Sequence, residues 1–210
     1  MRKIMKAEFF KLQKLPFVRM IFLFTAAAGI LRSFTPYTGY QVYIAGLLPE
    51  LFDAVLVSVF TVVFLSTEFS NQTFGNAFLC GTSRKNVFFA KLAAYFAGLL
   101  VLIIQPLFVS GIIATIRNGF GEGGTALEII IKFVLYIICR FSMAAFAIFA
   151  TSLLRNPIGS LGLSLAGIYL LFLAQNPMEI SVEPNIWIAY LGEITVFLGA
   201  STCIFVKRDL

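Results

Sequence analysis

Histidine is absent from the 210 residues of this chain. Its absence excludes zinc sites that depend on imidazole ligands, serine and cysteine triads, and the zinc-protease signature of two histidines on one helix face. Carboxylates are also sparse in the apolar segments, and the spacing of Asp53 and Glu193 does not indicate a paired acidic site. The sequence therefore disfavours an integral membrane enzyme, the first of two rival interpretations.

Cysteine is scarce, and a nucleotide-binding motif is missing. The cysteines are Cys80, Cys139 and Cys203, and they lie in or beside apolar segments. Their odd number and wide spacing predict free thiols and no metal site. The sequence has no Gly-rich loop that ends in Lys-Ser or Lys-Thr. We therefore expect the chain to bind no cofactor and to hydrolyse no ATP by itself.

Charged residues are also few, at 12% of the chain, whereas 60% of the residues are hydrophobic and the mean hydropathy is +0.94. Soluble proteins carry about a quarter charged residues, so most of the exterior must face lipid. The net charge of +6 arises from residues between the apolar runs and forms no basic face. We expect membrane lipids as the surroundings, and no nucleic acid as a partner.

The apolar runs predict an all-α membrane protein with about six transmembrane helices in a single domain, residues 1–210. The expected spans are residues 17–31, 49–66, 87–116, 128–154, 158–174 and 186–206. A polar loop is predicted between the first two spans. Gln105-Pro106 predicts a kink in the third span, because proline removes a helical hydrogen bond.

Residues 1–15 predict an amphipathic helix that lies in the membrane interface. Met5, Phe9 and Leu12 share one helical face, and lysines occupy the remainder. A secretory signal is the less favoured alternative, suggested by this basic start and by residues 26–28, which are alanines.

Lysine and arginine bias a loop toward the cytoplasm, and they are distributed unevenly here. One set of alternate connections holds Arg2, Lys3, Lys6, Lys11, Lys14, Arg19, Arg84, Lys85, Lys91, Arg155, Lys207 and Arg208, whereas the opposite set holds Arg32, Arg117 and Lys132. This asymmetry predicts that both termini are cytoplasmic.

The second loop, residues 68–91, carries the most specific pattern in the sequence. It combines an acidic residue, a polar turn, a short apolar stretch, a Gly-x-Ser-Arg element and a downstream lysine. These residues include Glu68, Asn71, Gln72, Thr73, Phe74, Phe78, Gly81, Ser83, Arg84 and Lys91. The pattern resembles the first cytoplasmic loop of type-2 ABC transporter permeases, and the whole chain is most similar to permeases of bacteriocin and lantibiotic immunity or peptide export.

The resemblance implies a permease subunit in a bacterial cell membrane. It would pair with a second permease, identical or related, and with two copies of a separate ATPase that binds ATP and Mg. The segment 69–86 would form a coupling helix that docks on this ATPase, with Phe74, Phe78 and Arg84 at the contact. The transported substrate would be an amphipathic peptide or a lipid-like molecule. The alternative is an interfacial helix that only anchors the neighbouring spans.

Arg140 lies near the middle of the fourth span, where a charge facing lipid costs about 2.5–3.5 kcal/mol. By depth, Glu193 and Asp53 are its acidic candidates, and we expect a pair between Arg140 and Glu193. Such a pair can tie the bundle together or contact the substrate, and both roles stay open.

The fifth span is rich in small residues at a spacing that lets two helices approach closely. The residues are Gly159, Ser160, Gly162, Ser164 and Ala166. Packing within the chain is one interpretation. The family resemblance adds a second, a dimer interface between permeases.

The second rival interpretation is a membrane channel or assembly factor that acts without ATP. It does not account for the polar pattern of residues 68–91.

Overall fold

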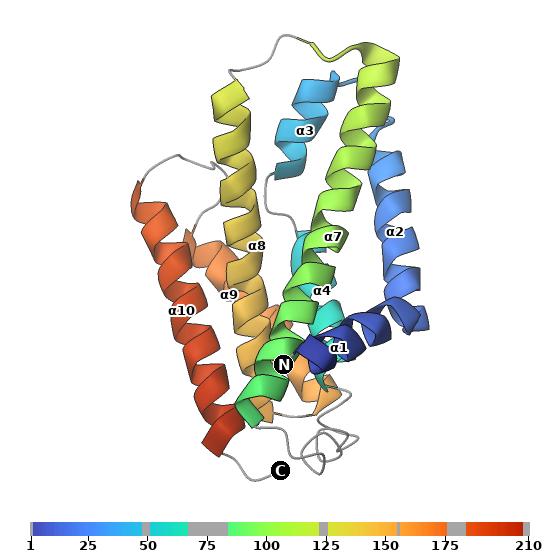
Figure 1. The fold of residues 1–210 in the computed structure, drawn as a ribbon. Coiled ribbons are helices and arrows are strands. Elements are labelled where there is room, and N and C mark those ends of the chain that lie inside the picture. The colour runs from blue at the N-terminus through green and yellow to red at the C-terminus, as the bar shows by residue number, and fades with distance from the viewer. Residues whose placement is uncertain are drawn as a thin grey trace.

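The computed structural model describes residues 2–47, 51–66, 84–121, 126–154, 156–175 and 184–207, and within these ranges the chain is helical with no strand (Figure 1). This confirms the all-α prediction. The helices are α1 (Arg2–Lys14), α2 (Pro16–Arg32), α3 (Gly39–Leu47), α4 (Leu51–Thr61) continued by the π-helix η1 (Val62–Ser66), α7 (Arg84–Asn118), α8 (Ala126–Leu154), α9 (Pro157–Gln175) and α10 (Pro184–Lys207).

Length and composition make α7, α8 and α10 able to cross a membrane. Two bent pairs, α1 with α2 and α3 with α4, raise the number of candidate spans in the described residues to as many as five if each pair counts as one span. The apolar part of α9 is shorter. The chain is thus compatible with a protein of several transmembrane helices, as its composition predicts.

The bend of 61° between α1 and α2 follows from Pro16, the first residue of α2. Proline has no backbone N–H, so it suits the first turn of a new helix and interrupts a continuing one. Helix α1 therefore lies across the end of the bundle instead of extending α2 (Figure 1). The predicted helix is present, and the residues of its predicted apolar face differ in burial. Leu12 packs on the core, whereas Phe9 is 36% exposed.

The sequence predicted a polar loop between the first two spans, which holds for residues 33–38, but residues 39–47 of that connection form helix α3. The nine residues of α3 are too few to be recognised as a transmembrane span from the sequence. They are nevertheless apolar, and α3 packs on α7. It is anchored at its start, because the amides of Gly39 and Tyr40 donate to the carbonyls of Gly119 and Phe120 at 3.0 and 2.9 Å. The helix that starts with α4 is bent by 57° relative to α3.

Helix α7 continues through Pro106 as a single helix. Helix α2 approaches it closely at this point. A Cβ atom on Gly29 would lie 2.8 Å from the carbonyl oxygen of Pro106. On α2, the hydroxyl of Thr25 donates to the side-chain oxygen of Gln105 at 3.0 Å. Helix α2 therefore packs on α7 at Pro106, the residue at which the sequence predicts a kink.

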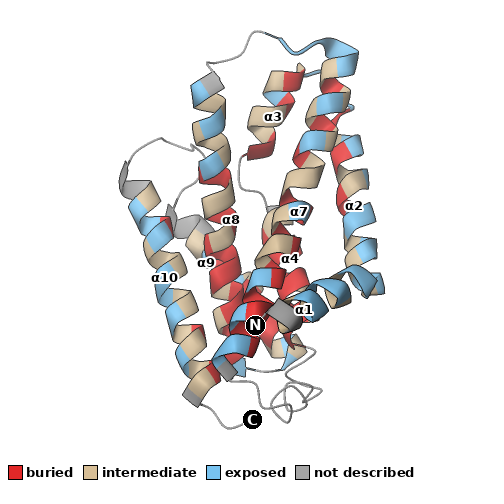
Figure 2. Ribbon diagram, in the orientation of Figure 1, coloured by how far each residue is buried: buried red, intermediate tan, exposed pale blue. Residues whose placement is uncertain are grey.

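Buried residues gather in the half of the bundle that contains α1 and the end of α10 (Figure 2). Phe60 and Tyr95 stack there with ring centroids 5.2 Å apart, and Phe88 stacks on Phe205 at 4.5 Å. The second stack joins the start of α7 to the end of α10. Helix α10 otherwise lies at the rim, packed mainly on α8.

Candidate functional site

Among the residues that the structure describes, Arg140 is the largest fully buried side chain, and it is 0% exposed. It lies midway along α8, a helix of 29 residues that is about 44 Å long at 1.5 Å per residue. The hydrocarbon core of a bilayer is about 30 Å thick, so the middle of such a span lies within it. An ionisable side chain at this depth is, by its cost, a candidate functional residue.

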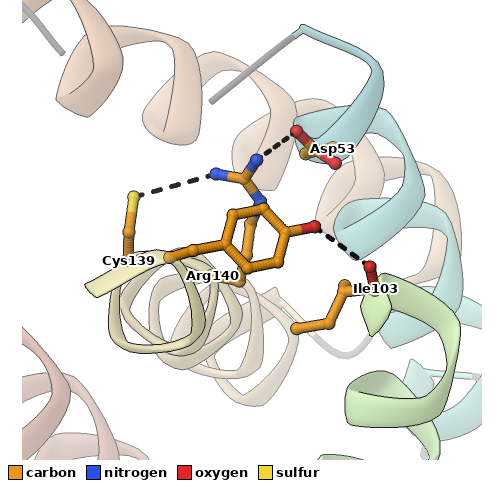
Figure 3. A network of polar contacts seen from close by, with 5 residues as sticks. Asp53, Ile103, Cys139 and Arg140 are labelled. Atoms are coloured by element: carbon orange, nitrogen blue, oxygen red, sulfur yellow. Dashed lines mark hydrogen bonds and ion pairs between the residues drawn. The ribbon is translucent and has the colours of Figure 1, made fainter. Parts of the chain in front are cut away.

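The guanidinium of Arg140 pairs with Asp53, at 2.5 Å between Nη2 and Oδ2 (Figure 3). Asp53 lies in the first turn of α4, where the helix dipole favours a carboxylate. The guanidinium also lies 4.4 Å from the ring centroid of Tyr136, and its Nη1 donates to the sulfur of Cys139 at 3.9 Å. The Tyr136 hydroxyl donates to the carbonyl of Ile103 at 3.0 Å. This network connects α4, α7 and α8 around one buried charge.

The predicted partner of Arg140 was Glu193, and the ion pair that the structure shows is with Asp53, the other candidate. Glu193 accepts a hydrogen bond from the hydroxyl of Ser142. The reason is rotation about the helix, because two residues turn an α-helix by about 200°. Arg140 consequently faces α4, while Ser142 faces α10. The depth of each residue in the membrane identifies Asp53 and Glu193 as acidic candidates. Depth does not determine toward which neighbouring helix Arg140 points.

A cavity of about 440 Å³ lies beside this ion pair. Residues of α2, α3, α4, α7 and α8 line it, and they combine apolar walls with a cation and an anion. The lining residues are Ala28, Gly29, Leu31, Arg32, Gly46, Phe52, Asp53, Pro106, Leu107, Ser110 and Tyr136. Mostly apolar walls with a few charged and polar groups are typical of small-molecule binding sites. The sequence predicts Arg32 in a loop and does not predict the cavity, because the lining residues come from segments that are distant in the sequence.

A second buried ion pair lies near the end of the bundle that α1 crosses. The ammonium of Lys91, 1% exposed, lies 2.9 Å from the carboxylate of Glu8. The same ammonium is 5.3 Å from the ring centroid of Phe64 in η1. The pair joins α1 to α7, and η1 and α7 flank the segment 67–83. From the sequence, Lys91 was predicted to be a charge of the second loop. Glu8 could have been recognised as a candidate for a buried ion pair, because it is an acidic residue in an otherwise basic helix.

Most of the predicted coupling segment lies outside the described residues. This applies to Glu68, Asn71, Gln72, Thr73, Phe74, Phe78, Gly81 and Ser83. Arg84 is the first residue of α7. The docking prediction therefore stays a prediction, and the structure contributes the two elements that border the segment.

The small residues of α9 divide between two faces. Ser160 and Ser164 are fully buried inside the bundle, one turn apart. Gly162 and Ala166 are exposed, and a Cβ atom on Gly162 would meet nothing within 4 Å. Gly159 lies between these extremes and is close to Leu154. Packing within the chain thus accounts for the serines, and the predicted dimer interface rests on the exposed pair.

Cys139 and Cys203 are free thiols, as predicted, and Cys80 lies outside the described residues. Among the residues that the structure describes, no group of three or more cysteine or acidic side chains could hold a metal ion.

Comparisons of the chain with family models, with curated proteins and with solved structures found no match.

Proposed function

We propose that this chain is the membrane-spanning permease subunit of an ATP-driven ABC exporter that moves amphipathic or antimicrobial peptides, in self-immunity or resistance. The observation that carries the transport part of this proposal is the cavity beside Arg140 and Asp53. A buried charge pair and a charged cavity at membrane depth are features of substrate pathways.

The break between α3 and α4 supports the same interpretation. Discontinuous helices at membrane depth place helix ends beside a binding site. Gly46 of α3 and Asp53 of α4 both line the cavity, one on each side of the break. The apolar walls would accept the apolar face of an amphipathic substrate, and Arg32 would meet an anionic group.

Six spans with both termini in the cytoplasm complete the proposed topology. The six spans would be the bent pair α1 and α2, the bent pair α3 and α4, and the helices α7, α8, α9 and α10. The arrangement supports an even number of crossings, since α1 and the end of α10 lie at the same end of the bundle (Figure 1). The excess of lysine and arginine in that set of connections supports a cytoplasmic location for this end.

ATP would be hydrolysed by two copies of a partner ATPase, docked on residues 69–86, and a second permease would complete the transporter. This part rests on the family resemblance. A route for force through the chain supports this part, because the Glu8–Lys91 pair joins α1 to the start of α7, directly after the docking segment. A rigid connection of this kind would let movement of the segment reach the α7 wall of the cavity.

The test is affinity purification in mild detergent from the native host. The native chain is compared with a variant in which Phe74, Phe78 and Arg84 are all changed to alanine. A nucleotide-hydrolysing partner should accompany the native chain, and both the partner and ATP hydrolysis should be lost with the variant. A matched control changes Ile116, Leu127 and Lys132 to alanine at the opposite end of the bundle, and it should retain the partner.

An ATP-independent channel or assembly factor is the second candidate, and the cavity suits it equally well. The purification separates the two. If no nucleotide-hydrolysing protein accompanies the native chain, the ATP-driven proposal fails. If the partner accompanies both the native chain and the triple variant, the ATPase docks elsewhere.

A further inference from the structure

A second cavity, of about 650 Å³, lies in the angle between α1 and α2, where both helices meet α7. We call it the elbow groove. It is separate from the cavity beside Arg140, and its lining is almost entirely apolar. The lining residues are Phe9, Leu12, Gln13, Val18, Arg19, Phe22, Leu23, Ala97, Gly98, Val101 and Leu102.

Two features of the sequence produce the elbow groove. Pro16 turns the chain by 61°, so α1 and α2 form two sides of an angle. Gly98 lets α1 reach the backbone of α7, because a Cβ atom there would lie 2.7 Å from Leu12 and 3.1 Å from Phe60. The groove opens toward the membrane, since Leu23 and Val101 in its walls are 68% and 52% exposed. An apolar chain can therefore enter it from the lipid.

The charged group in the lining is Arg19, and the lining contains no acidic residue. The Nε of Arg19 donates to the carbonyl of Gln13 at 3.2 Å, which holds the guanidinium at the elbow, where α1 ends and α2 begins. A guanidinium presents five donors in a planar fork that matches the oxygens of a phosphate. Arg19 thus adds a site for an anionic group to a groove that suits an apolar chain.

We propose that the elbow groove binds an anionic phospholipid, with an acyl chain against Val101 and Leu23 and the phosphate against Arg19. Both halves of this ligand are matched by the chemistry of the groove. The helix α1 reinforces the preference, because its basic residues favour anionic lipids at the same surface. A peptide is a poorer fit, since its backbone polar groups would find few partners among these side chains.

The test measures lipid retention by the purified, delipidated chain after incubation with vesicles of phosphatidylglycerol or of phosphatidylcholine. The native chain should retain the anionic lipid about fivefold better, the gain expected from one basic side chain near the surface. Arg19→Gln should remove most of this preference and leave only the part that the basic residues of α1 contribute. Val101→Trp should fill the groove and lower retention of both lipids. The controls are Lys85→Gln, an exposed cation on α7, and Ile158→Trp, an exposed position on α9, and both should behave as the native chain.

Three outcomes would overturn the proposal. Equal retention of the two lipids by the native chain removes the role of charge, and unchanged retention in Val101→Trp removes the groove. The third outcome concerns the source of the phosphate. If inorganic phosphate alone prevents retention of phosphatidylglycerol by the native chain but has no effect on Arg19→Gln, the site binds free phosphate and the acyl chain contributes nothing. Thermal unfolding of each variant without lipid verifies that it is folded.

Discussion

The ammonium of Lys91 lies 2.9 Å from the carboxylate of Glu8, 83 residues away in the sequence, and this contact holds α1 against α7. Lys91 is almost fully buried, so a water molecule cannot easily replace its partner. Removing one member of a buried pair costs more than the pair contributes, because the other charge stays buried.

Glu8→Gln should therefore lower the stability of the chain by about 2–3 kcal/mol, somewhat less than the loss for a fully buried pair, since Glu8 is 16% exposed. The midpoint of thermal unfolding in detergent measures this effect. The exchange Glu8→Lys with Lys91→Glu should recover part of the loss. As a comparison, Glu128→Gln, which disrupts a more exposed pair with Lys132, should cost less than about 1 kcal/mol. Equal losses in the two variants would contradict the buried role of Lys91.

The Arg140–Asp53 pair predicts strong coupling between these residues. Asp53→Asn and Arg140→Gln should each destabilise the chain, and the double variant should be more stable than the sum of the two losses implies, by about 1–3 kcal/mol. The measurement is a double-mutant cycle on thermal unfolding in detergent. The same cycle with Glu193→Gln in place of Asp53→Asn should give a smaller coupling. Equal coupling energies in the two cycles would show that Glu193 interacts with Arg140 as strongly as Asp53 does.

Gly29 should tolerate no side chain, because a Cβ atom there would press on the backbone of Pro106. Gly29→Ala should separate α2 from α7 and cost about 1–3 kcal/mol. Gly162→Ala is the matched control, since the space around Gly162 is open, and it should leave the stability nearly unchanged. Both effects are read from thermal unfolding, and a neutral Gly29→Ala would show that α2 can shift without loss.

If the proposed pairing of two permeases is correct, the exposed face of α9 is where a second copy of the chain would contact this one. In a chain whose native cysteines are replaced, Ala166→Cys should form a disulfide between two copies in the membrane. Ser164→Cys should not, because Ser164 is fully buried within its own bundle. Crosslinking is measured by the mobility of the dimer on a non-reducing gel. If both variants form dimers equally, the crosslinks arise from random collision. If neither variant forms dimers, the interface lies elsewhere or the partner is a different chain.

Hydrophobic runs located most of the helices because they are a local property. The observed bounds of α8, Ala126–Leu154, differ by two residues from the predicted start and not at all from the predicted end. The segment Gly39–Leu47 was missed for the same reason, since a helix of nine residues gives no span-length signal and is recognised through its packing on α7. The functional residues divide in the same way. The cost of a charge identified Arg140, but the choice between Asp53 and Glu193 depended on a rotation that the sequence does not contain.

The sequence by itself determined that this chain is a helical protein suited to a membrane, since composition and run length set the free energy of transfer into lipid. It also identified the amphipathic start and the costly buried arginine. Only the tertiary structure decided which face of α1 points inward, which carboxylate meets Arg140, and where the two cavities lie. The physical reason is that these features depend on how helices rotate and approach, and each residue turns its helix by about 100°. A pattern of hydrophobicity constrains that rotation loosely, whereas packing at Gly29, Gly98 and Asp53 fixes it.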